Sequence, residues 1–205
     1  MTSHLTRTEY AALEEAYDFF NQCLFNGQLP PCLMTLNRHR HARGYFAAER
    51  FGHREQEQRT DEIALNPDTF EQRTDLEILS TLVHEQCHLW QHHFGKTSRN
   101  GYHNKQWAEK MEAIGLMPSD TAAPGGKRTG QSVTHYLLPG GAFERAALEL
   151  LAQQFKLSWQ SPASLRKPTP KKVKYSCPAC SQNAWAKPNA HLLCGDCQAS
   201  MQAQG

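Results

Sequence analysis

The stretch LVHEQCHLW, residues 82–90, contains the order His-Glu-x-x-His at His84, Glu85 and His88. Histidines four residues apart lie one turn apart on a helix, so both imidazoles can bind one Zn²⁺. Glu85 then lies beside the metal, where a carboxylate can take a proton from an activated water molecule and pass it to a leaving amine. The stretch therefore predicts a catalytic zinc site with Glu85 as the general base.

The sequence around this pentad predicts the helix that carries it. Thr74 and Glu77 form a capping-box pair upstream, and Gly95 follows the last residue of the pattern. Between these limits apolar residues recur at helical spacing, namely Leu76, Leu79, Val83, Cys87, Trp90 and Phe94. We expect this stripe to face the core and the two histidines to project about a quarter-turn away from it.

A catalytic zinc needs a third protein ligand, and the nearest histidines do not fit that role. His92 and His93 lie two turns beyond His84, roughly 12 Å along the helix axis, so they are expected to be surface residues or outer neighbours of the site. Metzincins require a third histidine where this chain has Phe94, which excludes that class.

His103 is the preferred third ligand, because it stands just before the next predicted helix, where a loop residue can fold back onto the first pair. Glu109 and Glu112 on that helix remain the alternatives for a glutamate-ligated site. His135 is a more distant candidate for the ligand, and the simpler expectation for it is a partly buried polar residue in a strand.

The rest of the first 160 residues predicts a mixed fold. Thr6 and Glu9 are expected to form a capping box that opens a first helix, which ends at Gly27. Three short strands are expected in LMTLN, GYFAAERF and EIALN, and helices in the segments 105–114 and 142–155. The stretch between these two helices is expected to be a loop with one short extended piece. This pattern predicts an α+β fold.

Four of the seven cysteines form two tight pairs, CPAC and CGDC, separated by 13 residues: Cys177, Cys180, Cys194 and Cys197. Two such pairs supply four thiolates for a tetrahedral structural Zn²⁺ and indicate a reducing compartment rather than a disulfide framework. A module of some 30 residues cannot bury enough core to fold alone, so the zinc would provide its folding energy. We predict a zinc ribbon at residues 175–205.

A basic, proline-rich segment precedes the ribbon. Residues 161–174, SPASLRKPTPKKVK, hold three prolines and no acid, which predicts a linker after a domain at residues 1–160. Basic side chains here can neutralise phosphates, and an aromatic residue of the ribbon can stack on an unpaired base. The candidate nucleic-acid contacts are Arg166, Lys167, Lys171, Lys172, Lys174 and Trp185. In the simpler alternative, the linker is only solvated and the tryptophan lies in the core of the ribbon.

The bulk composition sets limits on partners and location. The 205 residues carry a net charge of +2 and are 39% hydrophobic, which excludes a strongly basic nucleic-acid binder and a disordered polyelectrolyte. The opening residues have no apolar signal region, and no apolar run is long enough to span a membrane. We expect a cytoplasmic protein without membrane partners, nucleoid-associated if it binds DNA. The sequence carries no signal for the oligomeric state.

Five stretches in this order give the chain a family resemblance: EYAALEEAYDFFNQCLFNGQLPP, EIALNP, LVHEQCHLW, YHNKQW and the terminal four-cysteine module. The chain resembles the SprT-like family, which includes the Spartan metalloproteases. The resemblance implies a zincin-like core of helices packed on a small β-sheet, followed by a zinc ribbon. It carries the three zinc-ligand histidines onto His84, His88 and His103, and the catalytic glutamate onto Glu85. Asn104 stands where family members often have glycine.

Two functions from different classes are compatible with these patterns. The first is a zinc metalloendopeptidase with one catalytic and one structural zinc, which cuts DNA-bound or DNA-crosslinked proteins, as the resemblance implies. The second is a non-enzymatic zinc- and nucleic-acid-binding protein that acts in transcription or DNA maintenance. The intact Glu85 favours the first, because a purely structural site has no use for a general base beside an open zinc position.

Overall fold

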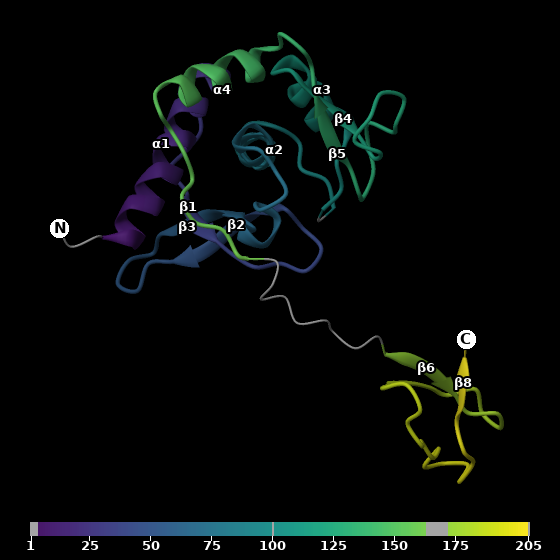
Figure 1. The fold of residues 1–205 in the computed structure, drawn as a ribbon. Coiled ribbons are helices and arrows are strands. Elements are labelled where there is room, and N and C mark those ends of the chain that lie inside the picture. Colours follow the sequence, from purple (N-terminus) through teal and green to yellow (C-terminus); the bar gives the residue numbers. More distant parts are fainter. Residues whose placement is uncertain (1–3, 100, 163–171, 205) are drawn as a thin grey trace. The chain divides into compact units, whose positions relative to one another are not determined.

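The computed structural model describes residues 4–99, 101–162 and 172–204 and divides the chain into two compact units, Met1–Ala163 and Ser164–Gly205 (Figure 1). No helix within those three ranges is both long enough and apolar enough to cross a membrane.

The first unit contains four α-helices and two small sheets among its described residues, which confirms the mixed α+β class. In chain order its elements are α1 (Leu5–Phe25), β1 (Leu33–Leu36), β2 (Gly44–Gly52), β3 (Arg59–Leu65), the short 3-10 helix η1 (Pro67–Thr69), α2 (Asp75–Phe94), α3 (Lys105–Ala113), β4 (Leu116–Ser119), β5 (Thr134–Leu137) and α4 (Ala142–Ala152).

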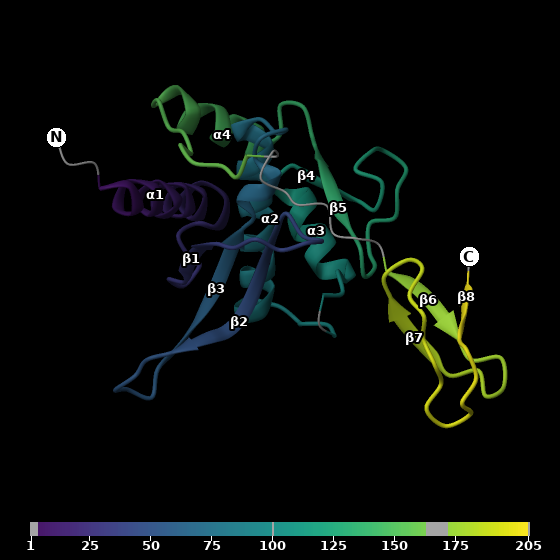
Figure 2. The same ribbon diagram turned by 60° about the horizontal axis from the view of Figure 1, so that its bottom comes forward.

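The larger sheet of this unit has the strand order β1–β3–β2, in which β1 runs parallel to β3 and β2 runs antiparallel to it. The three strands match the three expected from the sequence, but β2 and β3 extend further and form a protruding hairpin (Figure 2). In the stretch after α3, where one extended piece was expected, β4 and β5 pair as a second, antiparallel sheet. Strand β5 matches the expected extended piece, whereas β4 was not expected.

Helix α2 runs through the middle of the unit, with α1 and α4 on one side, α3 with β4 and β5 on another, and the larger sheet on a third (Figure 1, Figure 2). The predicted stripe is buried at Leu79, Val83 and Cys87, but it does not give the whole buried surface of the helix. Leu82 and Leu89 are completely buried although they lie outside the predicted stripe, whereas Phe94, inside it, is 52% exposed. Because neighbours pack on α2 from several directions, its sequence lacks a clean polar face.

The two predicted capping boxes have different outcomes. At α2 the box is confirmed, because the Thr74 side chain accepts from the Glu77 N–H while the Glu77 carboxylate accepts from the Thr74 N–H. At α1 it is wrong, since the helix begins at Leu5 without a side-chain cap. Glu9 is buried and accepts instead from the backbone N–H groups of Ser158 and Trp159. The Glu9 carboxylate is therefore bound to distant backbone groups and does not cap α1.

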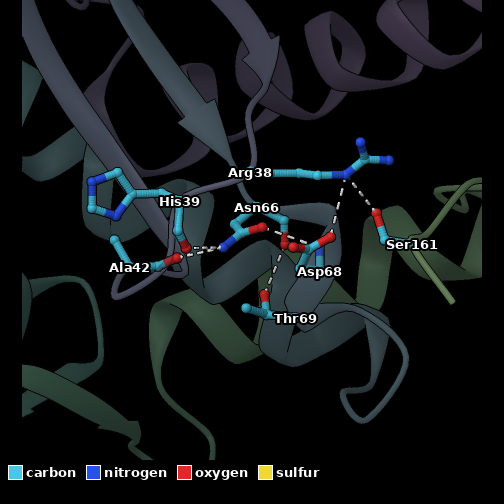
Figure 3. Close-up of polar contacts among 7 residues, drawn as sticks. All are labelled: Arg38, His39, Ala42, Asn66, Asp68, Thr69 and Ser161. Carbon is cyan, nitrogen blue, oxygen red and sulfur yellow. Dashed lines mark hydrogen bonds and ion pairs between the residues drawn. The ribbon is translucent and has the colours of Figure 1, made fainter. Parts of the chain in front are cut away.

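Asn66, which follows β3, fixes the loop that leads into β2 (Figure 3). Its amide nitrogen donates to the backbone oxygens of His39, at 2.7 Å, and Ala42, at 2.8 Å. Nearby, the Arg38 Nε donates to the Ser161 hydroxyl at 3.1 Å, so the first residue of the predicted linker is held against this unit. These contacts immobilise a loop that forms one wall of the site described below.

The second unit is a small antiparallel sheet with the strand order β7–β6–β8, built from β6 (Val173–Ser176), β7 (Asn183–Ala186) and β8 (Gln202–Gln204). Strand β6 begins within the segment that the sequence predicts as linker. The buried apolar residues in the described part of this unit are Tyr175, Cys177 and Cys194. The Tyr175 hydroxyl donates to the Lys187 oxygen and accepts from the Ala190 N–H, which ties the loop after β7 to β6.

Candidate active site

Three histidines from two segments meet at the centre of the first unit. His84 and His88 project from adjacent turns of α2, and their ring centroids are 5.1 Å apart. His103, just before α3, lies 5.4 Å from the His84 ring and 4.8 Å from the His88 ring. One ring nitrogen from each lies within 4.8 Å of the others, so these three residues could hold a metal ion together.

Trp107 forms the floor beneath the three imidazoles. Its side chain is completely buried, and its ring centroid lies 4.9 Å from His84, 5.1 Å from His88 and 4.3 Å from His103. The ring is stacked on His88 and meets the other two at steep angles. Trp107 thus packs against all three imidazoles at once.

Burial favours the neutral form of the three imidazoles, which is the form that binds a metal cation. Burial lowers the pKa of His84 well below its ordinary value and lowers the pKa of His88 to about 3. Burial also lowers the pKa of His103, although a hydrogen bond to the Gly130 backbone opposes that shift. An imidazole must be neutral to offer a lone pair to a metal. The site therefore keeps three uncharged nitrogen donors at neutral pH.

Hydrogen bonds at the far side of the rings select the nitrogen that faces the site. The Nδ1 of His103 lies 3.2 Å from the Gly130 oxygen, which can only accept, so that nitrogen carries the proton and Nε2 is free. The Nδ1 of His84 lies 3.2 Å from the Nδ1 of His135, and the Nε2 of His135 lies 2.9 Å from the Ser80 hydroxyl. The Ser80 hydroxyl donates its own proton to the backbone oxygen of Glu77, so it can only accept from His135. With these partners, His84 donates through Nδ1 and keeps Nε2 for a metal.

Glu85 lies on the same helix but faces the larger sheet. Its side chain is buried, and burial raises its pKa to about 8, opposed by a hydrogen bond from the Phe46 backbone N–H. Gly44 is needed for this approach, because a Cβ there would come within 2.9 Å of both the Ala64 oxygen and the Thr81 methyl group, and within 3.4 Å of the Glu85 carboxylate. The start of β2 thus lies directly against the carboxylate.

The histidines and Glu85 line a cleft of about 760 Å³. One wall is the loop held by Asn66 together with the start of β2, and the opposite wall is the segment that leads into β5. At the start of β2 the lining residues are Gly44, Tyr45 and Phe46. A cleft of this size can admit several residues of an extended peptide beside the three imidazoles.

The remaining candidates for the third ligand are engaged elsewhere. Glu109 pairs with Lys105 at 3.5 Å in an exposed helical pair, and Glu112 forms an ion pair with Arg128. His135 is a partly buried residue of strand β5, as expected, and it also lies against His84. No local pattern in the sequence could have indicated this contact, because 51 residues separate the two histidines.

The comparison with known proteins agrees with this site. The model of the SprT-like family matches residues 13–134, which include the C-terminal part of α1, both pentad histidines, Glu85 and His103. The chain belongs to the SprT-like family. A Salmonella typhimurium protein described as "Uncharacterized protein in mucB 3'region" is 48% identical over 58 residues, which cover 28% of this chain and 78% of that protein. No solved structure matches this SprT-like chain. Family membership indicates a zinc-dependent domain of the metalloprotease type.

In the second unit of this SprT-like protein, the sulfur atoms of Cys177, Cys180, Cys194 and Cys197 lie within 4.8 Å of one another. The two pairs have the same backbone geometry. Cys177 accepts from the Ser181 N–H and donates to the Gln182 oxygen, while Cys194 accepts from the Gln198 N–H and donates to the Ala199 oxygen. In each pair the residue after the second cysteine has a positive φ, 60° at Ser181 and 51° at Gln198. The two matched turns bring four sulfurs close enough to hold a metal ion, and four thiolates are a common donor set of structural zinc sites.

The predicted nucleic-acid contacts divide between described and undescribed parts of the chain. Arg166, Lys167 and Lys171 lie outside the described residues, while Lys172 is exposed just before β6. Lys174 on β6 is paired directly with Trp185 on β7, and both side chains are exposed, the tryptophan by 60%. The alternative of a core tryptophan in the ribbon is therefore wrong.

Proposed function

We propose that this SprT-like protein is a zinc-dependent endopeptidase that acts on polypeptides bound or crosslinked to DNA. The observation that carries the proposal is the convergence of His84, His88 and His103 beside a buried Glu85 in a cleft wide enough for a peptide. Three neutral imidazoles leave one position of a tetrahedral ion open, which is the ligand pattern of a catalytic zinc rather than a closed structural one.

The residues fit the metal by the chemistry of their donors. His84, His88 and His103 would hold the ion through Nε2, and the partners of their Nδ1 atoms favour that tautomer for His84 and His103. When bound, zinc supplies a Lewis acid that polarises a carbonyl group and lowers the pKa of water.

Glu85 is the residue that moves the proton. As a carboxylate it accepts the proton of the attacking water, and as a carboxylic acid it donates that proton to the leaving amine. Burial raises its pKa to about 8, so both forms lie within reach near neutral pH. The Phe46 N–H donates to the carboxylate and holds it against the start of β2.

Strand β2 supports the choice of a polypeptide as substrate. It lies at the edge of the larger sheet, and Gly44, Tyr45 and Phe46 at its start line the cleft. An extended peptide can add to an exposed sheet edge through main-chain hydrogen bonds, which bind many sequences with similar strength. Such binding suits an enzyme that acts on varied proteins.

The ribbon supports the association with DNA. Lys174 and Trp185 form an exposed cross-strand pair, with Lys172 two residues before the first of them. A cation beside an aromatic face is the combination with which proteins bind single-stranded nucleic acid, the cation at a phosphate and the ring on a base.

The test of the activity is cleavage of a protein covalently attached to an oligonucleotide, with and without added DNA. Glu85→Gln at matched zinc content should cut at least about 10²- to 10⁴-fold more slowly than the wild type, because it removes the general base. Glu109→Gln is the matched control, since this exposed glutamate pairs with Lys105 on the surface of α3 and the variant should cut at the wild-type rate.

Equal rates for Glu85→Gln and wild type would remove Glu85 from the mechanism. If neither protein cuts free or DNA-attached substrates, the protein is better described as a non-enzymatic zinc- and nucleic-acid-binding protein in transcription or DNA maintenance.

The association with DNA has its own test in single-strand binding. Trp185→Ala should weaken binding by roughly 5- to 150-fold per stacked base. The double change Lys172→Gln and Lys174→Gln should lower the slope of log K against log salt by about 0.7 for each lost phosphate contact. Trp159→Ala removes a 51% exposed tryptophan of the first unit and serves as the control. Unchanged affinity in Trp185→Ala would limit the ribbon to a structural role.

A further inference from the structure

A second group of metal-ligand side chains lies at the end of α2, outside the candidate active site. Asp61 on β3 and the neighbouring residues His92 and His93 place one ligand atom each within 4.8 Å of one another. This group shares no residue with the group formed by the three histidines of the cleft.

Asp61 is held with one carboxylate oxygen aimed at the histidines. Its side chain is buried, its Oδ1 accepts from the Glu49 backbone N–H at 2.7 Å, and its Oδ2 lies 2.6 Å from the His93 Nε2. Glu49 reaches this position because the register of β2 shifts between Ala47 and Phe51, and Glu49 itself has a φ of 48°. A β-bulge with a left-handed non-glycine residue costs free energy and commonly re-aims groups at functional sites.

The two histidines approach the carboxylate from the last turn of α2. Their ring centroids are 4.9 Å apart with the planes at 86°, and the His92 ring also lies 5.8 Å from Phe46, a residue that lines the cleft. His93 is partly exposed, so the group can be reached from solvent. An ion pair of Asp61 with His93 would account for the short contact between them, but it gives no reason for a nitrogen of His92 to converge on the same point.

We propose that Asp61, His92 and His93 form an additional metal site that binds a divalent transition cation, with Zn²⁺ as the best match. Two imidazoles and one carboxylate are a common donor set for zinc and its neighbours. Calcium and magnesium prefer sites made only of oxygen ligands, so they do not fit.

The bound ion joins the C-terminal end of α2 to β3. The other end of α2 is fixed by its capping box, and the catalytic pentad lies between the two. A ligand that binds only the folded state stabilises that state. Occupancy of this site therefore holds the helix that carries His84 and His88 against the strand that supports the cleft.

The test is the number of Zn²⁺ ions that the full-length protein retains after dialysis with Zn²⁺ alone, measured by elemental analysis. We expect His92→Gln to retain one ion fewer than the wild type, and Asp61→Asn, which keeps the shape but removes the charge, to do the same. His53→Gln, an exposed histidine on the β2–β3 hairpin, should retain the wild-type number.

The comparison uses the difference between variants, so it does not depend on whether the active site or the ribbon is filled. Added Zn²⁺ should also raise the melting temperature of the wild type more than that of His92→Gln. If Asp61→Asn does not fold, His92→Gln, at a half-buried position, decides the result. Equal ion counts in wild type and His92→Gln would overturn the site, whatever the outcome of the cleavage assay.

Discussion

The units Met1–Ala163 and Ser164–Gly205 each bring metal-ligand side chains together, but they differ in the apolar core that supports those side chains. The first unit buries a continuous cluster of aromatic and aliphatic side chains from all four of its helices and from its larger sheet. In the described part of the second unit the buried apolar residues are Tyr175, Cys177 and Cys194, two of which are themselves candidate ligands.

Because of this difference, a bound metal should contribute differently to the folding of the two units. In the first unit the apolar core and the indole of Trp107 position the histidines, so the ligands are arranged by packing. In the second unit the chain has too little apolar surface to bury, and the ligands themselves form the core. Metal should therefore bind to a ready site in the first unit and create the fold in the second.

The largest expected effect is the loss of the ribbon without its zinc. Cys194→Ser should unfold residues 173–204, because structural zinc contributes about 10–16 kcal/mol to the folding of such modules. The amide resonances of these residues should collapse to the range of unfolded chains, while those of α1 to α4 stay dispersed. Cys23→Ser, at an exposed position of α1, is the control. A ribbon that stays folded in Cys194→Ser would break the comparison.

A smaller effect is expected when one ligand is removed from the first unit. His103→Ala should weaken zinc binding at the active site by more than about 100-fold, beyond the range that loss of an outer partner causes. The helical circular dichroism should stay at the wild-type level, because Trp107 and the surrounding core remain. The readout is competition with a chelator, and the ribbon's zinc should be unaffected. Cooperative unfolding of the first unit in His103→Ala would show that its metal is structural too.

The smallest effect concerns His135, which contacts a ligand without being one of the three. His135→Ala should weaken zinc binding at the active site by about 10- to 100-fold, since it removes the partner of the His84 Nδ1. His135→Gln offers a side-chain oxygen as acceptor and should restore part of the affinity, which loss of packing alone would not explain. If both variants bind zinc as tightly as the wild type, His135 has no positioning role.

The features that the sequence predicted correctly depend on contacts within one or two helical turns. The capping box of Thr74 and Glu77 and the helix end at Gly95 are confirmed, since the partners are neighbours in the chain. The box of Thr6 and Glu9 has the same spacing and is wrong, because Glu9 bonds to backbone groups about 150 residues away. Local patterns predict local bonds only where no distant group competes for the same atom.

Contacts between segments that are distant in the chain could not be predicted from this sequence. The ring contact between His84 and His135, the completely buried Trp107 floor and the second strand pair of β4 and β5 all join segments that are distant in the chain. The exposure of Trp185 was also undecidable from its residue type, since tryptophan is common both in cores and at binding surfaces.

The sequence by itself determined the family, the helix with its His-Glu-x-x-His pentad and the two cysteine pairs, because each depends on spacings that a helix or a tight turn converts directly into geometry. Only the tertiary structure decided that His103 and His135 lie beside the pentad, and that Asp61 meets the end of α2. Those distances depend on how helices and strands pack, and packing sums many weak contacts across the whole unit, which no short stretch of sequence contains.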